Sequence, residues 1–408
     1  MVLISIDNLI TLIKVNKTNY ISQMEEKMVK KIAVLGAGNG GYVMAADLSM
    51  VGYEVNLYEL PDYADFNLGP VMDRGGIEVI SQDPSGKEII LSAGGKSGFT
   101  KITGNVTSDI EKAIKGVEIL MLVVPGFVRE QFIRTFAPYL EDGQIILIWP
   151  GYFGALQCVK LLKDLDIQKD IAIAETESLI YNCTKLGNAK VRNKGQKEKM
   201  LVSVFPSQKR EETFKKLQNI YPQFMPSENV LETTLVNVNP PLHPQSVLLN
   251  LYRVERKFFP FDEILNKPVQ KAYDVTPGMA RVMEEIDNER INIGKKLGLQ
   301  LNSLQKVLGI FYGAKGENLY ETISTCYAYQ VQGAPTSLED RYVTEDVPYG
   351  LVPYTLLGEQ IGVSMDNIRA MATIGCSVTG RNFWEEGLNM EKVGLAGKNA
   401  QEIVDFLN

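Results

Sequence analysis

Histidine is almost absent from this sequence, which contains a single one, His243, in 408 residues. Imidazole is the side chain best suited to moving protons near neutral pH, because its unperturbed pKa is about 6.5. If the protein transfers protons through a histidine, only His243 is available. The scarcity also argues against a zinc site, since the four cysteines lie far apart and none forms a C-x-x-C pair. We therefore expect no bound metal.

Long apolar runs and an excess of basic residues are missing as well. No apolar run approaches the roughly 20 residues that cross a bilayer, so we expect no membrane association. The chain has 42 Lys and Arg against 49 Asp and Glu, a net charge of −7, which argues against nucleic-acid binding. Scattered cysteines fit a reducing compartment and predict a cytoplasmic protein. A hydrophobic content of 45% is ordinary for a globular chain with a large core.

The first 27 residues lack the pattern of a secretory signal. The segment from Met1 to Val15 is apolar, but its first lysine, Lys14, follows the apolar stretch instead of preceding it. A second methionine, Met28, stands just before the first predicted strand. We interpret residues 1–27 as a dispensable N-terminal extension, either a misassigned start or a docked arm.

Residues 28–205 alternate between strand and helix patterns. Short apolar runs that end at glycine, proline or an acid predict buried parallel strands, and helical spacing separates them. Such alternation predicts an α/β fold with a Rossmann-type, doubly wound sheet that binds a dinucleotide. The runs are 31–35, 53–59, 118–124, 144–149 and 170–174.

Two further patterns complete the predicted architecture. A turn signature at Asp83–Gly86 predicts a hairpin between residues 77–80 and 88–91. From about residue 206 the spacing becomes helical, with Thr276 and a following proline typical of a helix start. Residues 206–408 are therefore expected to form a mostly α-helical C-terminal domain that carries the substrate and catalytic groups.

A glycine-rich segment follows the first predicted strand and matches G-x-G-x-x-G. The first glycine allows a tight turn, the second lets the backbone approach a pyrophosphate, and the third lets a helix pack close to the strand. The phosphates then face the helix N-terminus. This context predicts a nicotinamide dinucleotide site; a glycine-rich turn without ligand is the alternative. The predicted cofactor-binding residues of the motif are Gly36, Ala37, Gly38, Asn39, Gly40 and Gly41.

Glu59 ends the second predicted strand, at about the 20-residue distance where a dinucleotide-binding fold places its ribose-binding acid. A carboxylate there repels a 2′-phosphate, and Leu60 and Pro61 follow it instead of an arginine. Glu59 therefore favours NAD over NADP, with NADP left open. Pro125 ends another predicted strand, at the edge where open α/β sheets form their ligand crevice, and we count it as cofactor-binding. A plain turn residue is the alternative there.

Two segments of the second half carry a resemblance to a known family. One is Asn239-Pro240-Pro241-Leu242-His243-Pro244, and the other runs from Arg341 to Pro353 with an R-x-x-x-x-D pattern. With the glycine motif they resemble the octopine/nopaline (opine) dehydrogenase family over residues 28–408. The resemblance implies NAD(P)H-dependent reductive condensation of a 2-oxo acid with the amino group of an amino acid, and the reverse oxidation. It also implies a catalytic dyad of His243 and Asp346, and contact between Arg341 and the cofactor.

The chemistry of such a dyad also follows from its residue types. Reducing an imine adds a hydride to carbon and a proton to nitrogen, and a general acid/base works best with a pKa near the operating pH. An aspartate on the far ring nitrogen fixes the tautomer of the imidazole and stabilises imidazolium. Glu345 is the adjacent alternative, and only the motif register selects Asp346. A roughly extended span from Arg341 to Asp346 would cover about 16 Å, and a turn would shorten it, so one end can touch the cofactor and the other His243. Val347-Pro348 favours extended backbone at the end of the span.

Two other functions stay open at this point. A ketopantoate-reductase-like or 2-hydroxyacid-type oxidoreductase would oxidise NADH with the oxo acid alone. A non-catalytic NAD(H)-sensing protein would bind the cofactor and turn over no substrate pair. The sequence identifies neither the amino acid nor the oxo acid, and a homodimer is one open assembly.

Overall fold

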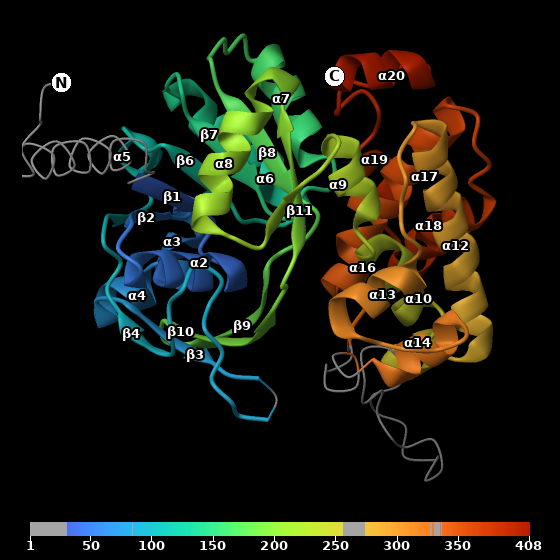
Figure 1. The fold of residues 1–408 in the computed structure, drawn as a ribbon, viewed down its shortest axis with the longest axis horizontal. Coiled ribbons are helices and arrows are strands. Elements are labelled where there is room, and N and C mark those ends of the chain that lie inside the picture. Colours follow the sequence, from blue (N-terminus) through green and yellow to red (C-terminus); the bar gives the residue numbers. More distant parts are fainter. Residues whose placement is uncertain (1–30, 84, 256–273, 327–328, 330–334, 336) are drawn as a thin grey trace, which may run out of the picture.

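The computed structural model describes residues 31–83, 85–255, 274–326, 329, 335 and 337–408. The predicted extension, residues 1–27, lies outside the described residues. Figure 1 shows two lobes side by side, a sheet lobe built from the first half of the chain and a helical lobe built from the second. Among the described residues, no helix is both long enough and apolar enough to cross a membrane.

The sheet lobe is centred on an eight-stranded mixed sheet, which confirms the predicted Rossmann-type fold. Neighbouring strands are parallel throughout except β11, which runs antiparallel to β8. The central strands are buried on both faces, as their apolar runs predict. In spatial order the strands are β12 (Phe224–Pro226), β11 (Met200–Phe205), β8 (Ala172–Thr176), β7 (Ile145–Ile148), β6 (Ile119–Leu122), β1 (Lys31–Leu35), β2 (Glu54–Tyr58) and β5 (Val106–Thr107). Strand β12 belongs to this sheet although it lies beyond residue 205, the predicted end of the dinucleotide-binding domain.

Helices connect these strands and cover the sheet. The two that matter for the site begin at its carboxyl edge: α2 follows β1, and α6 follows β6. The connecting helices are α2 (Asn39–Met50), α3 (Pro61–Asn67), α4 (Gly69–Arg74), α5 (Ile110–Ile114), α6 (Gly126–Phe136), α7 (Gly154–Asp164) and α8 (Arg210–Ile220).

The hairpin predicted between residues 77–80 and 88–91 forms only next to its turn, where Asp83 N donates to Lys87 O at 2.9 Å and Ile89 N donates to Ser81 O at 3.0 Å. Residues 88–91 contribute one isolated bridge, Gln82–Glu88, and the strand β3 (Ile77–Ser81) finds its partners elsewhere. It pairs antiparallel with β4 (Gly98–Thr100) and parallel with β10 (Lys190–Gln196), which itself pairs with β9 (Tyr181–Gly187). Turn chemistry indicates only local pairing, whereas β10 reaches β3 from far along the chain. The β9–β10 turn holds Asn188 and Ala189 at φ 48° and 52°, directly after Gly187 at φ 83°, a turn that the sequence reasoning missed.

The second half is mostly helical, as predicted. Thr276 accepts a hydrogen bond from the Met279 N–H and caps α12, in agreement with the predicted helix start. The helices are α9 (Val230–Val236), α10 (Asn239–Leu248), α11 (Leu251–Glu255), α12 (Pro277–Lys296), α13 (Leu304–Tyr312), α14 (Leu319–Thr325), α16 (Arg341–Thr344), η3 (Val347–Leu351), α17 (Val352–Gln360), α18 (Asp366–Thr379), α19 (Phe383–Glu386) and α20 (Ala400–Leu407).

One apolar core runs across the boundary between the lobes. It joins Ile148 and Phe153 of the sheet lobe to Leu231, Val343 and Leu357 of the helical lobe, all of them buried. The rings of Phe153 and Tyr354 lie 6.1 Å apart within it. Because this core packs the carboxyl edge of the sheet against the helical lobe, polar groups at that edge are held in a protein interior.

Candidate active site

The glycine-rich loop joins β1 to α2, where the sequence places it. Gly36 has a φ of +104°, and a Cβ built on Gly41 would lie 1.8 Å from the Gly36 carbonyl oxygen. Only glycine fits both positions. A Cβ built on Gly38 would meet no atom of the described residues within 4 Å, so the backbone faces open space there. Helix α2 begins directly after Gly38, which has no side chain to cap it. Its first N–H groups and the open backbone fit a dinucleotide pyrophosphate.

Glu59 lies at the end of β2, as predicted, and its carboxylate holds the glycine-rich loop. Oε2 accepts hydrogen bonds from Ala37 N at 3.0 Å and Asn67 Nδ2 at 2.9 Å, and Oε1 accepts one from Leu60 N at 3.0 Å. Burial raises the pKa of Glu59 above its usual range, and these three N–H groups act in the opposite direction. Glu59 therefore organises the loop in addition to the ribose contact predicted for it.

A lysine from β9 completes this arrangement, and the sequence reasoning missed it. Lys185 Nζ donates to Ala37 O at 3.2 Å and to Asn67 Oδ1 at 2.8 Å, and it lies 4.1 Å from the centre of the Tyr42 ring. Its backbone N–H also binds Asn39 Oδ1 at 2.9 Å. The Lys185 ammonium group and the Glu59 carboxylate thus bind the same side chain, that of Asn67. Lys185 belongs to β9, and only the fold shows that β9 lies beside α2.

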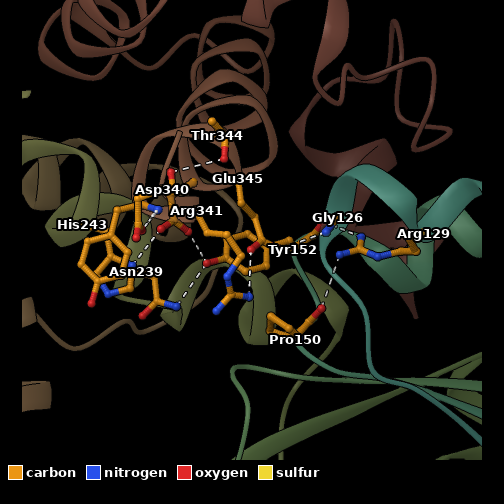
Figure 2. Close-up of polar contacts among 12 residues, drawn as sticks. Gly126, Arg129, Pro150, Tyr152, Asn239, His243, Asp340, Arg341, Thr344 and Glu345 are labelled. Atoms are coloured by element: carbon orange, nitrogen blue, oxygen red, sulfur yellow. Dashed lines mark hydrogen bonds and ion pairs between the residues drawn. The ribbon is translucent and has the colours of Figure 1, made fainter. Parts of the chain in front are cut away.

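His243 and Asp346 are in contact between the lobes. Figure 2 shows His243 close to Asn239 and Tyr152 in the same centre. His243 Nδ1 lies 2.8 Å from Asp346 Oδ2, and the Tyr342 ring stacks on the imidazole at a centroid distance of 3.7 Å. The exposed fraction of the side chain is 14% for His243 and 5% for Asp346. Since an ionised carboxylate only accepts hydrogen bonds, Nδ1 carries a hydrogen and the proton exchanged with a substrate would be carried on Nε2. The catalytic role of the pair stays a prediction.

Tyr152 is a third member of this centre that the sequence reasoning did not select. Its hydroxyl donates to Asp346 Oδ1 and accepts a hydrogen bond from Asn239 Nδ2 at 3.2 Å. Burial raises the pKa of Tyr152 well above its ordinary value, and the charge of Asp346 adds to the shift, so the hydroxyl stays protonated. The available signal was its place directly after Pro150-Gly151 at the carboxyl end of β7.

Glu345 has partners other than His243. Its Oε1 accepts a hydrogen bond from Gly126 N at 2.9 Å, and its Oε2 lies 3.4 Å from Arg341 Nη1. Burial raises the pKa of Glu345, while the Arg341 charge lowers it. Gly126 opens α6 directly after Pro125, the predicted cofactor-binding residue at the end of β6. Arg341, with 64% of its side chain exposed, is therefore linked through Glu345 to the edge of the predicted cofactor crevice.

The segment from Arg341 to Asp346 is shortened by helical turns, and the extended backbone expected at Val347-Pro348 is wrong, because η3 begins there. The segment is helical, because the Asp340 side chain accepts the Tyr342 N–H at 3.0 Å and starts α16. Arg341 and Glu345, four residues apart, share a face and pair. Adjacent residues of a helix point about 100° apart, which turns Asp346 away from Glu345 and towards His243.

Comparisons with known proteins agree over 92–93% of the chain. A family model described as NAD/NADP octopine/nopaline dehydrogenase, alpha-helical domain, matches residues 226–379. An opine dehydrogenase of Arthrobacter sp. is 32% identical over 375 residues, covering 92% of this chain and 98% of that protein. Vitopine synthase of Allorhizobium ampelinum is 24% identical and covers 93% of this chain and 99% of its own length. A solved octopine dehydrogenase in complex with NADH and agmatine has the same fold, with a TM-score of 0.74 at 19% identity, covering 92% of this chain and 98% of its own.

Proposed function

Since the chain belongs to the opine dehydrogenase family, we propose that it joins a 2-oxo acid to the amino group of an amino acid with NAD(P)H, using His243 as the proton-transfer group. The observation that carries the assignment of roles is the 2.8 Å contact between His243 Nδ1 and Asp346 Oδ2, placed where the helical lobe packs on the carboxyl edge of the sheet. That edge is where open α/β sheets bind their ligands.

The reaction has two stages, imine formation and imine reduction, and the His243–Asp346 pair transfers the proton of the second stage. The amine nitrogen attacks the carbonyl carbon and water leaves, which forms an imine. Reduction then adds a hydride to the imine carbon and a proton to the nitrogen. Bound NAD(P)H supplies the hydride. Nε2 of His243 delivers the proton, and in the reverse direction it accepts one, while Asp346 holds the ring and stabilises the imidazolium.

The cofactor contacts are assigned to the glycine-rich loop and its surroundings. Gly38 and the start of α2 would face the pyrophosphate, Glu59 the adenosine ribose, and Arg341 with Pro125 the other edge of the crevice. We propose NAD as the preferred cofactor, because the Glu59 carboxylate repels a 2′-phosphate. The ammonium group of Lys185 and the Glu59 carboxylate both bind the Asn67 side chain. This cation near Glu59 would attract a 2′-phosphate, which supports a measurable use of NADP as well.

An oxidation screen tests the function. NADH and NADPH would be offered with pyruvate, 2-oxoglutarate or oxaloacetate, each crossed with the twenty amino acids. Pyruvate and arginine come first, because structures of octopine dehydrogenase carry NADH with L-arginine or with pyruvate. We expect cofactor oxidation only when both substrates are present, and a secondary amine with two carboxyl groups in the product mass.

Omitting the amine separates the alternatives. Oxidation with the oxo acid alone would identify a ketopantoate-reductase-like or 2-hydroxyacid-type enzyme. Cofactor binding without turnover of any pair would identify an NAD(H)-sensing protein. Small-molecule substrates, a cytoplasmic location and a homodimer stay part of the proposal, and the net charge of −7 supports the expectation that nucleic acid is not a partner.

A further inference from the structure

We propose that Tyr152 is a positioning residue: its hydroxyl holds the Asp346 carboxylate so that His243 keeps its hydrogen on Nδ1. Among the residues that the structure describes, each oxygen of Asp346 has one hydrogen-bond partner. Oδ2 accepts from His243 Nδ1, which belongs to the helical lobe, and Oδ1 accepts from Tyr152, which belongs to the sheet lobe. The catalytic consequence rests on the proposed function, but the positioning does not.

The direction of the hydrogen bonds is determined by the residue types. The Asn239 amide nitrogen can only donate, so the Tyr152 oxygen is the acceptor of that 3.2 Å contact. The single hydrogen of Tyr152 is then left for Oδ1 of Asp346, which accepts it. A chain of donors therefore runs from Asn239 through Tyr152 to Asp346, and each bond polarises the next.

Burial makes the Tyr152 bond necessary for Asp346. Asp346 is 3% exposed and Tyr152 is also 3% exposed. A buried carboxylate oxygen that loses its donor is destabilised unless it finds another one. Without the Tyr152 hydroxyl, the Asn239 amide loses its acceptor and becomes free to donate to the carboxylate. The carboxylate would turn towards it and leave Nδ1 of His243 without a fixed acceptor.

The loop that carries Tyr152 is held in an unusual backbone conformation. Tyr152 and Phe153 have φ values of 48° and 59°, a region that residues other than glycine rarely adopt. Two contacts keep it there: Arg129 Nη1 donates to Tyr152 O at 3.2 Å, and Phe153 N donates to Thr234 Oγ1 at 2.9 Å. Arg129 is completely buried. Strained residues that the surroundings hold in place are typical of functional sites.

The single histidine makes this proposal directly measurable. In a protein produced with ¹⁵N-histidine and no histidine tag, every imidazole nitrogen signal belongs to His243. The ¹⁵N shifts report which ring nitrogen carries the hydrogen in the neutral form. We expect the Nδ1–H tautomer in the unmodified protein. Tyr152→Phe should give a mixture with the Nε2–H tautomer.

A matched control loses the same kind of bond elsewhere. The Tyr181 hydroxyl donates to the buried Asp47 carboxylate at 2.6 Å within the sheet lobe. Tyr181→Phe should leave the His243 spectrum unchanged. A single Nδ1–H tautomer in Tyr152→Phe, or an equal disturbance in Tyr181→Phe, would overturn the proposal.

A second variant keeps the test decisive if Tyr152→Phe does not fold. Asn239→Ala leaves the Tyr152–Asp346 bond in place, so it should keep the single Nδ1–H tautomer, and a tautomer mixture in that variant would assign the positioning to Asn239 and overturn the proposal. With an active substrate pair, Tyr152→Phe should lower kcat about tenfold, the effect of one hydrogen bond, with an unchanged KM for NADH. The spectra need no substrate, so they judge the positioning role even if every substrate pair proves inactive.

Discussion

The glycine-rich loop and the histidine centre are built in opposite ways. The loop, Gly36–Gly41, is held by Glu59 from the adjacent strand, and the Ala37–Glu59 bond spans 22 residues of sequence. The histidine centre joins Tyr152, His243 and Asp346, and its two bonds to Asp346 span 194 and 103 residues. The first site is local in the chain except for Lys185, and the second exists only where two lobes meet.

This difference predicts that the two sites fail separately. Changes in the loop should alter cofactor affinity and selectivity, because its groups face the dinucleotide. Changes in the histidine centre should alter turnover, because its groups hold or move a proton. Glu345 connects Arg341 to Gly126 between the two sites. Variants of this connection therefore measure how far the cofactor site and the histidine centre are independent.

The largest effect is expected for His243→Asn. Asparagine keeps a polar side chain of similar shape but cannot exchange a proton near neutral pH, so kcat should fall by about 10²–10⁴. NADH affinity, measured by fluorescence titration, should stay unchanged because the glycine-rich loop is intact. Near-normal turnover in a folded variant would remove His243 from the mechanism.

Asp346→Asn should lower kcat by roughly 10²-fold, because the imidazole loses its orienting partner and the imidazolium its counter-charge. The pH above which reductive turnover declines should therefore move down. Glu345→Gln is the matched control, since it neutralises the adjacent carboxylate and keeps an acceptor for Gly126 N. A larger loss of kcat in Glu345→Gln than in Asp346→Asn would reverse the assigned roles.

Arg341→Ala should raise the KM for the cofactor about tenfold with a small change in kcat, as expected for a lost charge-assisted contact. Arg369→Ala is a suitable control, because that arginine pairs with Glu359 at the surface of the helical lobe. If Arg341→Ala lowered kcat and shifted the pH profile as Asp346→Asn does, the two sites would not be separable along this segment.

The smallest effect concerns cofactor choice. We expect a higher kcat/KM with NADH than with NADPH, and Lys185→Met should widen the difference by a few-fold, because it removes a cation near Glu59 that attracts a 2′-phosphate. Steady-state kinetics with both cofactors measure it. Lys190→Met controls for the loss of a lysine on the same hairpin, since Lys190 pairs with Glu78. A higher kcat/KM with NADPH in the unmodified protein would show that Glu59 does not set the preference.

The sequence by itself determined the features whose causes lie within a few residues. The strand–loop–helix unit at Gly36, the acid at Glu59 and the helix start at Thr276 each depend on local turn, cap and periodicity chemistry. The family resemblance, carried by two short segments, also named His243 and Asp346, and the structure places them in contact. Their roles await the kinetic tests.

Only the tertiary structure decided which distant groups meet. The β9–β10 hairpin, Lys185 beside Glu59, and Tyr152 on Asp346 depend on contacts between segments far apart in the chain. Which of Glu345 and Asp346 contacts His243 depends on the helix that Asp340 starts. Successive residues of a helix are rotated by about 100°, so the two neighbouring carboxylates face different partners. Local sequence specifies the conformation of a segment, whereas packing of the two lobes specifies which side chains face each other.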